Sequence, residues 1–210
     1  NKYFEVMSGS LRPEERQGVT AWIGSTVFGA ASFFMLFAVP LLTMRTISEE
    51  RRQQTLTFLN TAPISLTEIV VGKFFGLLAF LSILLGVIFI MMSALAMWAD
   101  IDYGFILSNL LGLFLLVGSF CALGIYVSSL TQQPVVAAII SFVVLSALLF
   151  FDNFFVDSPN GVTAYLSLMR HFQPFSRGLI DTSDIVYFLL FIITFLTLTV
   201  RRLDADRLRG

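Results

Sequence analysis

Five long runs of apolar residues, almost free of charge, dominate the sequence. They cover residues 19–42, 69–98, 105–130, 135–151 and 185–203. A helix needs about 20 mostly apolar residues to cross about 30 Å of hydrocarbon, and each run comes close to that length. Inside a bilayer the backbone satisfies its polar groups only in a helix or a closed barrel, and these runs lack the alternation of barrel strands. The sequence therefore predicts an all-α integral membrane protein with five transmembrane helices.

The composition supports this class and argues against several others. The chain is 57% hydrophobic and 13% charged, against roughly 45–50% and about 25% in soluble domains. Its net charge is −1, so no basic surface for nucleic acid is expected. The single cysteine, Cys121, lies inside an apolar run. It predicts a small buried residue, because one cysteine forms neither an internal disulfide nor a metal-binding cluster.

Lysine and arginine are unevenly distributed around the apolar runs, and this predicts the orientation. Eight of the thirteen fall on the side that holds residues 43–68 and the C-terminal tail: Arg45, Arg51, Arg52, Lys73, Arg201, Arg202, Arg207 and Arg209. We place that side in the cytoplasm, and residues 1–18 and the loop 152–184 outside. Residues 1–18 lack the features of a signal peptide, so we expect an earlier helix and six spans in the intact protein.

The cytoplasmic segment 43–64 is the most informative part of the chain. One helical face carries Met44, Ile47, Thr55, Phe58 and Ala62, and another is charged. This pattern is typical of an amphipathic helix along a membrane surface. Pro63 ends the segment, and Ser65 with Glu68 predicts a capping box that begins the next helix. A solvated charged linker and a docking surface for a cytosolic partner both remain open.

No catalytic, nucleotide or metal site is indicated. Gly72-Lys73 resembles the end of a phosphate-binding loop, but Thr67 and Phe74 stand where that motif needs Gly and Ser or Thr. His171 is the only histidine, and we interpret it as a surface residue. No charged residue lies in the middle of a run, which argues against an ion-coupled carrier. We therefore expect the driving energy to enter through another subunit.

Two further patterns concern packing. Small residues spaced four apart favour close approach of helices in lipid. They occur as the pairs Ser25/Gly29, Gly72/Gly76 and Gly118/Ala122. In the loop 152–184, residues 164–172 are amphipathic enough for a short interfacial helix outside the membrane.

Two blocks of sequence resemble the ABC-2 type permeases. The first block, residues 40–65, reads PLLTMRTISEERRQQTLTFLNTAPIS and is followed at residues 69–74 by IVVGKF. The second reads HFQPFSRGLID at residues 171–181, with DIVY at 184–187. The second block is similar to the branch of the family linked to gliding motility and to maturation of copper enzymes.

The resemblance implies a permease subunit of an ATP-binding cassette transporter in the bacterial inner membrane, with a cytoplasmic C-terminus. Such a subunit pairs with a second permease half, of the same or a different chain, and with two cytosolic ATPase subunits. These bind ATP and Mg²⁺, so this chain is expected to hold no cofactor and to be no enzyme itself. Residues 44–62 match the coupling helix of the family. The implied ATPase-contacting residues are Arg45, Glu49, Glu50, Arg51 and Arg52.

Three functions are compatible with the sequence. The first is transport by alternating access, with export as the direction that the resemblance favours. The second is a non-transporting anchor that passes ATPase-driven motion to an extracytoplasmic accessory protein. The third, an intramembrane enzyme, is disfavoured because the runs contain no catalytic group. The family usually shows Gly-Thr after the charged residues, whereas this chain has Gln54-Thr55. The sequence does not identify a substrate.

Overall fold

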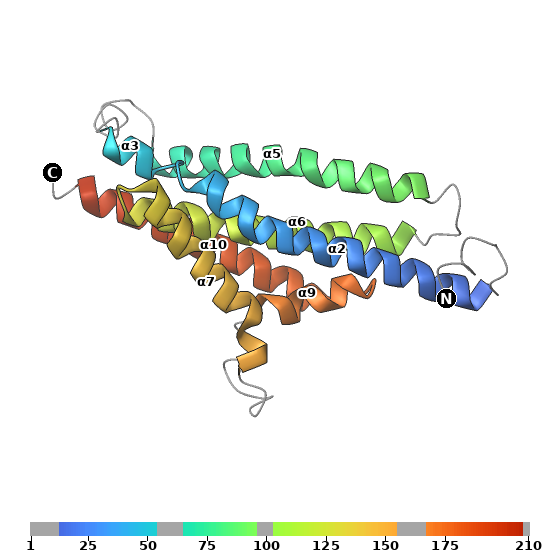
Figure 1. Cartoon of the computed structure of the whole chain (residues 1–210). Coiled ribbons are helices and arrows are strands. Elements are labelled where there is room, and N and C mark those ends of the chain that lie inside the picture. The colour runs from blue at the N-terminus through green and yellow to red at the C-terminus, as the bar shows by residue number, and fades with distance from the viewer. Residues whose placement is uncertain (1–12, 54–64, 96–102, 155–166, 208–210) are drawn as a thin grey trace.

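The computed structural model in Figure 1 describes residues 13–53, 65–95, 103–154 and 167–207. The long helices are α2 Pro13–Thr43, α5 Leu66–Leu95, α6 Tyr103–Leu130, α7 Pro134–Phe154 and α10 Thr182–Arg207. Two short helices, α3 Ser48–Arg52 and α9 Leu168–Ser176, lie between them in the chain. These described parts of the chain contain no strand. The prediction of an all-α protein is confirmed.

Four helical segments are long and apolar enough to cross a membrane: Thr26–Arg52, Leu66–Ala94, Tyr103–Leu130 and Thr182–Arg207. The run predicted at 135–151 also forms an apolar helix, but its apolar stretch Pro134–Phe150 is shorter than the other four. An apolar helix cannot expose this much hydrocarbon to water, so these helices identify a membrane protein.

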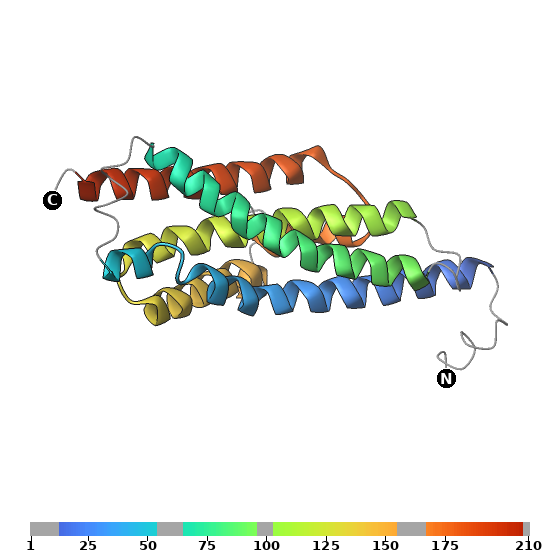
Figure 2. The ribbon, with the colours of Figure 1, turned by 90° about the horizontal axis from the view of Figure 1, so that it is seen from above.

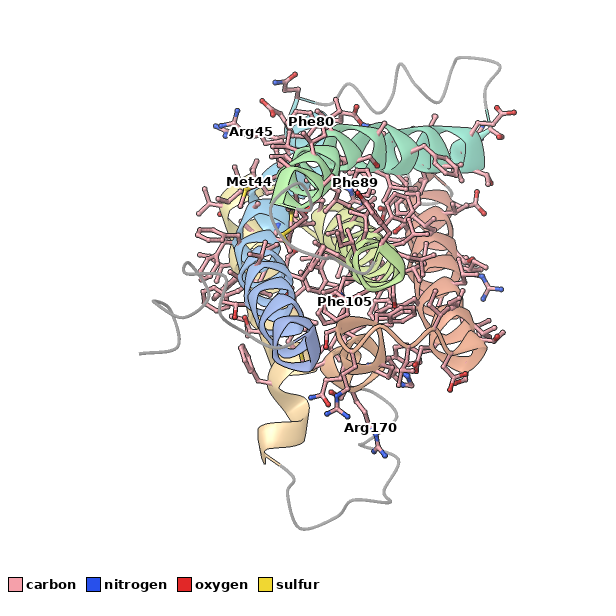
Figure 3. The ribbon with its side chains drawn as sticks, turned by 90° about the vertical axis from the view of Figure 1, so that its right-hand side faces the viewer. Met44, Arg45, Phe80, Phe89, Phe105 and Arg170 are labelled. Carbon is pink, nitrogen blue, oxygen red and sulfur yellow. The ribbon has the colours of Figure 1, made fainter. Side chains whose placement is uncertain are left out.

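Helix α6 forms the centre of the bundle. It is the most buried of the spans, and α2, α5, α7, α9 and α10 all pack against it. Figures 1 and 2 show the long helices extending along a shared direction, with α5 crossing α6 at an angle and α7 diverging toward its C-terminal end. The view along the bundle in Figure 3 shows α6 surrounded by its neighbours. Helix α5 is the least buried span.

Local sequence explains where two helices begin. The backbone N–H of Ser65 donates to Glu68 Oε2 at 3.0 Å, and the N–H of Glu68 donates to Ser65 Oγ at 3.2 Å. This reciprocal pair confirms the predicted capping box at the start of α5. Ser167 caps α9 in a related way, with its Oγ accepting from the N–H of Arg170 at 3.4 Å.

Only part of the predicted small-residue packing is found. A Cβ atom at Gly118 would lie 3.1 Å from Ile192 of α10, and Ala122 is fully buried, so this pair confirms the packing interpretation. A Cβ atom at Gly29, Gly72 or Gly76 would meet nothing within 4 Å. Among the described residues, no neighbouring helix therefore packs closely over the Cα atoms of these three glycines.

A short helix, α9, overlaps the one predicted at 164–172, but it begins after the cap Ser167 and extends to Ser176, and it packs into the bundle where an interfacial helix was expected; residues 164–166 lie outside the described part. Its apolar face is buried in the bundle through Leu168, Phe172 and Phe175. Phe175 lies directly over Gly112 of α6, where an added Cβ atom would be 2.5 Å from the Phe175 Cβ. Ser108 Oγ also donates to the Phe175 carbonyl at 3.2 Å. Helix α9 is thus held against α6 by shape and by a polar contact.

Candidate functional site

Helix α3 lies at the end of the bundle where α10 also ends (Figure 1). Of the predicted helix 44–62, the structure describes residues 44–53, and only Ser48–Arg52 are helical. Ile47, which precedes this helix, and Ser48, its first residue, are buried. The predicted apolar-face residues Thr55, Phe58 and Ala62 lie outside the described residues. A helix of five residues is unstable alone, so contacts with the rest of the bundle must hold it in place.

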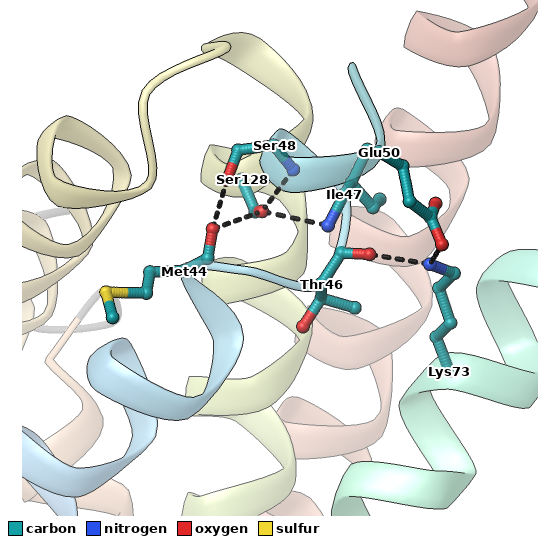
Figure 4. A network of polar contacts seen from close by, with 7 residues as sticks. All are labelled: Met44, Thr46, Ile47, Ser48, Glu50, Lys73 and Ser128. Carbon is teal, nitrogen blue, oxygen red and sulfur yellow. Dashed lines mark hydrogen bonds and ion pairs between the residues drawn. The ribbon is translucent and has the colours of Figure 1, made fainter. Parts of the chain in front are cut away.

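Ser128 of α6 holds the beginning of α3, as Figure 4 shows. Its Oγ accepts from the N–H of Ile47 at 3.2 Å and from the N–H of Ser48 at 3.1 Å. The same hydroxyl donates to the Met44 carbonyl at 3.0 Å. The first N–H groups of a helix have no partner within it, and Ile47 has no side chain that could cap them. A residue of α6 therefore supplies the cap that α3 lacks.

Lys73 joins α3 to the beginning of α5. Its Nζ donates to the Thr46 carbonyl at 2.6 Å and pairs with Glu50 of α3 (Figure 4). Both side chains of the ion pair are largely shielded from solvent. The Lys73 ammonium thus binds the chain on both sides of the α3 N-terminus.

Arg51 joins α3 to the last turns of α10. Its guanidinium pairs with the carboxylate of Asp206, and only 12% of the Arg51 side chain is exposed. Arg202, one turn earlier in α10, also approaches Asp206 at 3.5 Å. We call the contacts of Ser128, Lys73 and Asp206 with residues 44–51 the α3 network. It connects α3 to α6, α5 and α10.

The five predicted contact residues divide into two groups. Glu50 and Arg51 belong to the α3 network and face the bundle. Arg45 and Arg52 are exposed, and Glu49 is half-exposed beside Gln53. Figure 3 shows Arg45 pointing away from the helices. The segment 45–52 thus exposes Arg45, Glu49 and Arg52 on its outer side, while Glu50 and Arg51 bind its inner side to the bundle.

Sequence reasoning missed Ser128 and Asp206. Ser128 belongs to a Ser-Ser pair near the end of an otherwise apolar run, and Asp206 stands four residues after Arg202. The spacing of Arg202 and Asp206 indicates a local ion pair on one helix face. Neither pattern indicates a contact with α3, because both partners come from distant parts of the chain.

The interpretation of His171 as a surface residue is wrong. Only 15% of its side chain is exposed, and its Nδ1 lies 2.6 Å from Asp184 Oδ1. The imidazole also stacks on Tyr187, with ring centroids 3.9 Å apart. Sequence reasoning placed Asp184 outside the last span and gave it no partner. Among the described residues no group of three or more His, Cys, Asp or Glu side chains could hold a metal ion.

The contribution of Ser128 can be measured with Ser128→Ala. This change leaves the buried N–H groups of Ile47 and Ser48 without their partner, while the Met44 carbonyl keeps its bond from the Ser48 hydroxyl, at an expected cost of about 1–3 kcal/mol. We expect hydrogen exchange to become faster in residues 44–53. Ser119→Ala is the matched control, because the hydroxyl of buried Ser119 donates to the Leu115 carbonyl of its own helix and, among the described residues, to no other element. Equal exchange in both variants would show that Ser128 does not hold α3.

Comparison with known proteins gives one match. Residues 9–208 of the chain match the family model described as ABC-2 family transporter protein. No curated protein and no solved structure matches. The matched region includes α3 and all three helices that the α3 network connects to it.

Proposed function

The chain belongs to the ABC-2 family of transporter proteins, and from this premise we propose that α3 is the element through which a cytosolic ATPase drives the protein. The chain is a multi-pass membrane component of an ABC transporter and not the ATPase itself. In the proposed assembly, two ATPase subunits hold ATP and Mg²⁺, and a second permease half, of the same or a different chain, completes the pathway.

One observation carries the proposal. Within residues 44–52, contacts of residues 44–51 bond the segment to α5, α6 and α10, while Arg45, Glu49 and Arg52 face outward. A partner that binds these outward charges therefore binds a segment whose inner side is bonded to three spanning helices. Interfaces and packed cores switch between discrete arrangements, so a displacement of α3 is passed on and not absorbed.

The proposed mechanism is alternating access. ATP-driven closure of the ATPase subunits pushes α3, and α2 moves with it because the chain leads directly from Thr43 into the turn before Ser48. Lys73 carries the motion to α5, Ser128 to α6 and Asp206 to α10. The two helices that flank α3 in the chain, α2 and α5, therefore move with it. Through the α3 network, we expect α6 and α10 to move as well.

We propose that the α3 end is cytoplasmic, in a bacterial inner membrane, and that transport is outward. Basic residues gather at this end: Arg45, Arg51, Arg52, Lys73, Arg201, Arg202 and Arg207. Lysine and arginine near helix ends favour the cytoplasmic side, which supports this orientation. Membership of the branch linked to gliding motility and copper enzymes rests on the block at residues 171–187 and is likewise a proposal.

The docking proposal predicts that Glu49→Lys combined with Arg52→Glu releases the partner. Reversing both charges puts like charges opposite those of the ATPase, which costs several kcal/mol at an interface. We expect an ATPase to co-purify with the intact protein from its native membrane in mild detergent. The doubly reversed variant is expected to lose at least about nine-tenths of it, which corresponds to roughly 1.4 kcal/mol.

The matched control is Arg201→Glu combined with Asp204→Lys. These exposed residues have the same spacing and opposite charges, lie at the same end of the bundle, and belong to α10. The control variant is expected to retain the ATPase. The proposal is wrong if the Glu49/Arg52 variant retains it as well, or if no ATPase accompanies the unchanged protein.

A further inference from the structure

His171 and Asp184 form an ionisable pair within the bundle, away from α3. His171 lies in the first turns of α9 and Asp184 in the first turn of α10. Their Nδ1 and Oδ1 atoms are 2.6 Å apart, and Asp184 as a residue is only 6% exposed. Tyr187, one turn further along α10, covers the imidazole with its ring. The pair therefore connects the two helices at a point where both are shielded from solvent.

Among the residues whose side chains the structure describes, no other charge near this pair could balance Asp184. No Asp, Glu, Lys, Arg or His occurs on α6, on α7 up to Phe150, or on α2 from Gly24 onward. Arg170, Arg177 and Asp181 are exposed, and Figure 3 shows Arg170 pointing away from the bundle. On α10 the next charged residue after Asp184 is Arg201, near the α3 end. Within the described part of the chain, His171 is thus the partner on which the charge of Asp184 depends.

Elementary electrostatics gives this pair a dependence on protons. A buried carboxylate without a counter-charge is costly, and a protonated imidazole supplies that charge through a short, charge-assisted hydrogen bond. Imidazole is also the side chain whose charge ordinarily changes between pH 5 and 8. The second nitrogen, Nε2, is buried and has no partner among the described residues. It is the atom that takes up the proton when Nδ1 faces Asp184.

We propose that His171 and Asp184 form a proton-binding site that fastens α9 to α10. Protonation creates the ion pair and tightens the contact between the two helices. Loss of the proton leaves Asp184 buried with a neutral partner and loosens it. Protonation also leaves the buried Nε2–H without an acceptor. This costs less free energy than a buried carboxylate without a counter-charge. In the proposed orientation this site lies in the extracytoplasmic half, so docking of α9 there responds to protons independently of α3.

Hydrogen exchange of α9 in the purified, intact protein tests the proposal. Exchange of residues 168–176 is measured at pH 6 and pH 8 and corrected for the intrinsic dependence of amide exchange on pH. We expect protection of α9 to be about tenfold greater at pH 6. Because His171 is the only histidine, ¹⁵N-histidine labelling reports one imidazole, whose signals show at each pH whether the ring is neutral or protonated.

Two conservative variants separate proton binding from ordinary packing. His171→Asn keeps an N–H donor near the position of Nδ1 but cannot be protonated, so α9 should show the lower protection of pH 8 at both pH values. Asp184→Asn removes the buried charge and should abolish the dependence too. Asp204→Asn makes the same change at an exposed site of α10 and should preserve it. The proposal fails if unchanged protein shows no dependence, if the imidazole signals stay constant, or if His171→Asn retains it.

Discussion

Gly124→Val is expected to separate α2 from α6 and to destabilise the bundle by about 3 kcal/mol, the upper end of the usual cost of overpacking. A Cβ atom at Gly124 would lie 2.2 Å from Thr43 Oγ1 and 2.8 Å from Thr43 Cβ. Rotation of Thr43 cannot relieve this contact, because its Cβ is fixed to the backbone. Thr43 is fully buried, and its hydroxyl donates to the Val39 carbonyl at 2.9 Å. Thermal unfolding of the purified protein in detergent measures the loss.

Gly76→Val is the matched control for this change. Gly76 lies in the interior of α5, where an added Cβ atom would meet nothing within 4 Å. Both substitutions replace a helical glycine by the same β-branched residue, so they differ only in what the side chain meets. Gly76→Val is expected to leave the unfolding temperature within a few degrees of the unchanged protein. Similar unfolding of the two variants would contradict the close approach of α2 and α6.

The helical class of the protein could be predicted because it depends on local composition. A run such as residues 105–130 contains no charge and too many apolar residues for a soluble surface, and in lipid only a helix satisfies its backbone. The capping box of Ser65 and Glu68 is local in the same sense, since its partners stand three residues apart. Features that span one turn of helix or one apolar run are therefore accessible from sequence.

The inner half of the candidate site could not be predicted because its partners meet only after folding. Arg51 and Asp206 are 155 positions apart, and Ile47 and Ser128 are 81 apart. The sequence shows that residues 49–52 are charged, but the positions of α5, α6 and α10 decide which of these charges are buried. His171 has a partner 13 residues away, across the turn between α9 and α10. Spacing rules for one helix do not cover such a pair.

Asp206→Arg is expected to uncouple the transporter while leaving its ATPase attached. The substitution places a third guanidinium beside Arg51 and Arg202, and the repulsion pushes α3 away from α10. The Arg51 side chain is 12% exposed and that of Asp206 34%, so solvent screens part of the effect. We expect a cost between those of exposed and buried pairs, about 1–3 kcal/mol. ATP hydrolysis should continue, since Arg45, Glu49 and Arg52 are unchanged, but conformational change in α10 should no longer accompany it.

Spin labels placed on α5 and α10 of the intact complex can follow this change as a distance that responds to ATP. Asp204→Arg, an exposed change two residues earlier on α10, is the control and should preserve the response.

Exchanging the two charges distinguishes the ion pair from the individual residues. Arg51→Asp combined with Asp206→Arg restores opposite charges across α3 and α10, so the ATP-dependent response should return. The recovery should be partial, because Arg202 lies 3.5 Å from Asp206 in the unchanged protein and would face a like charge in the exchanged one. Adding Arg202→Gln removes that repulsion and should complete the recovery. If Asp206→Arg alone keeps the full response, α10 does not receive motion through Arg51, and α2, α5 and α6 remain as the routes from α3.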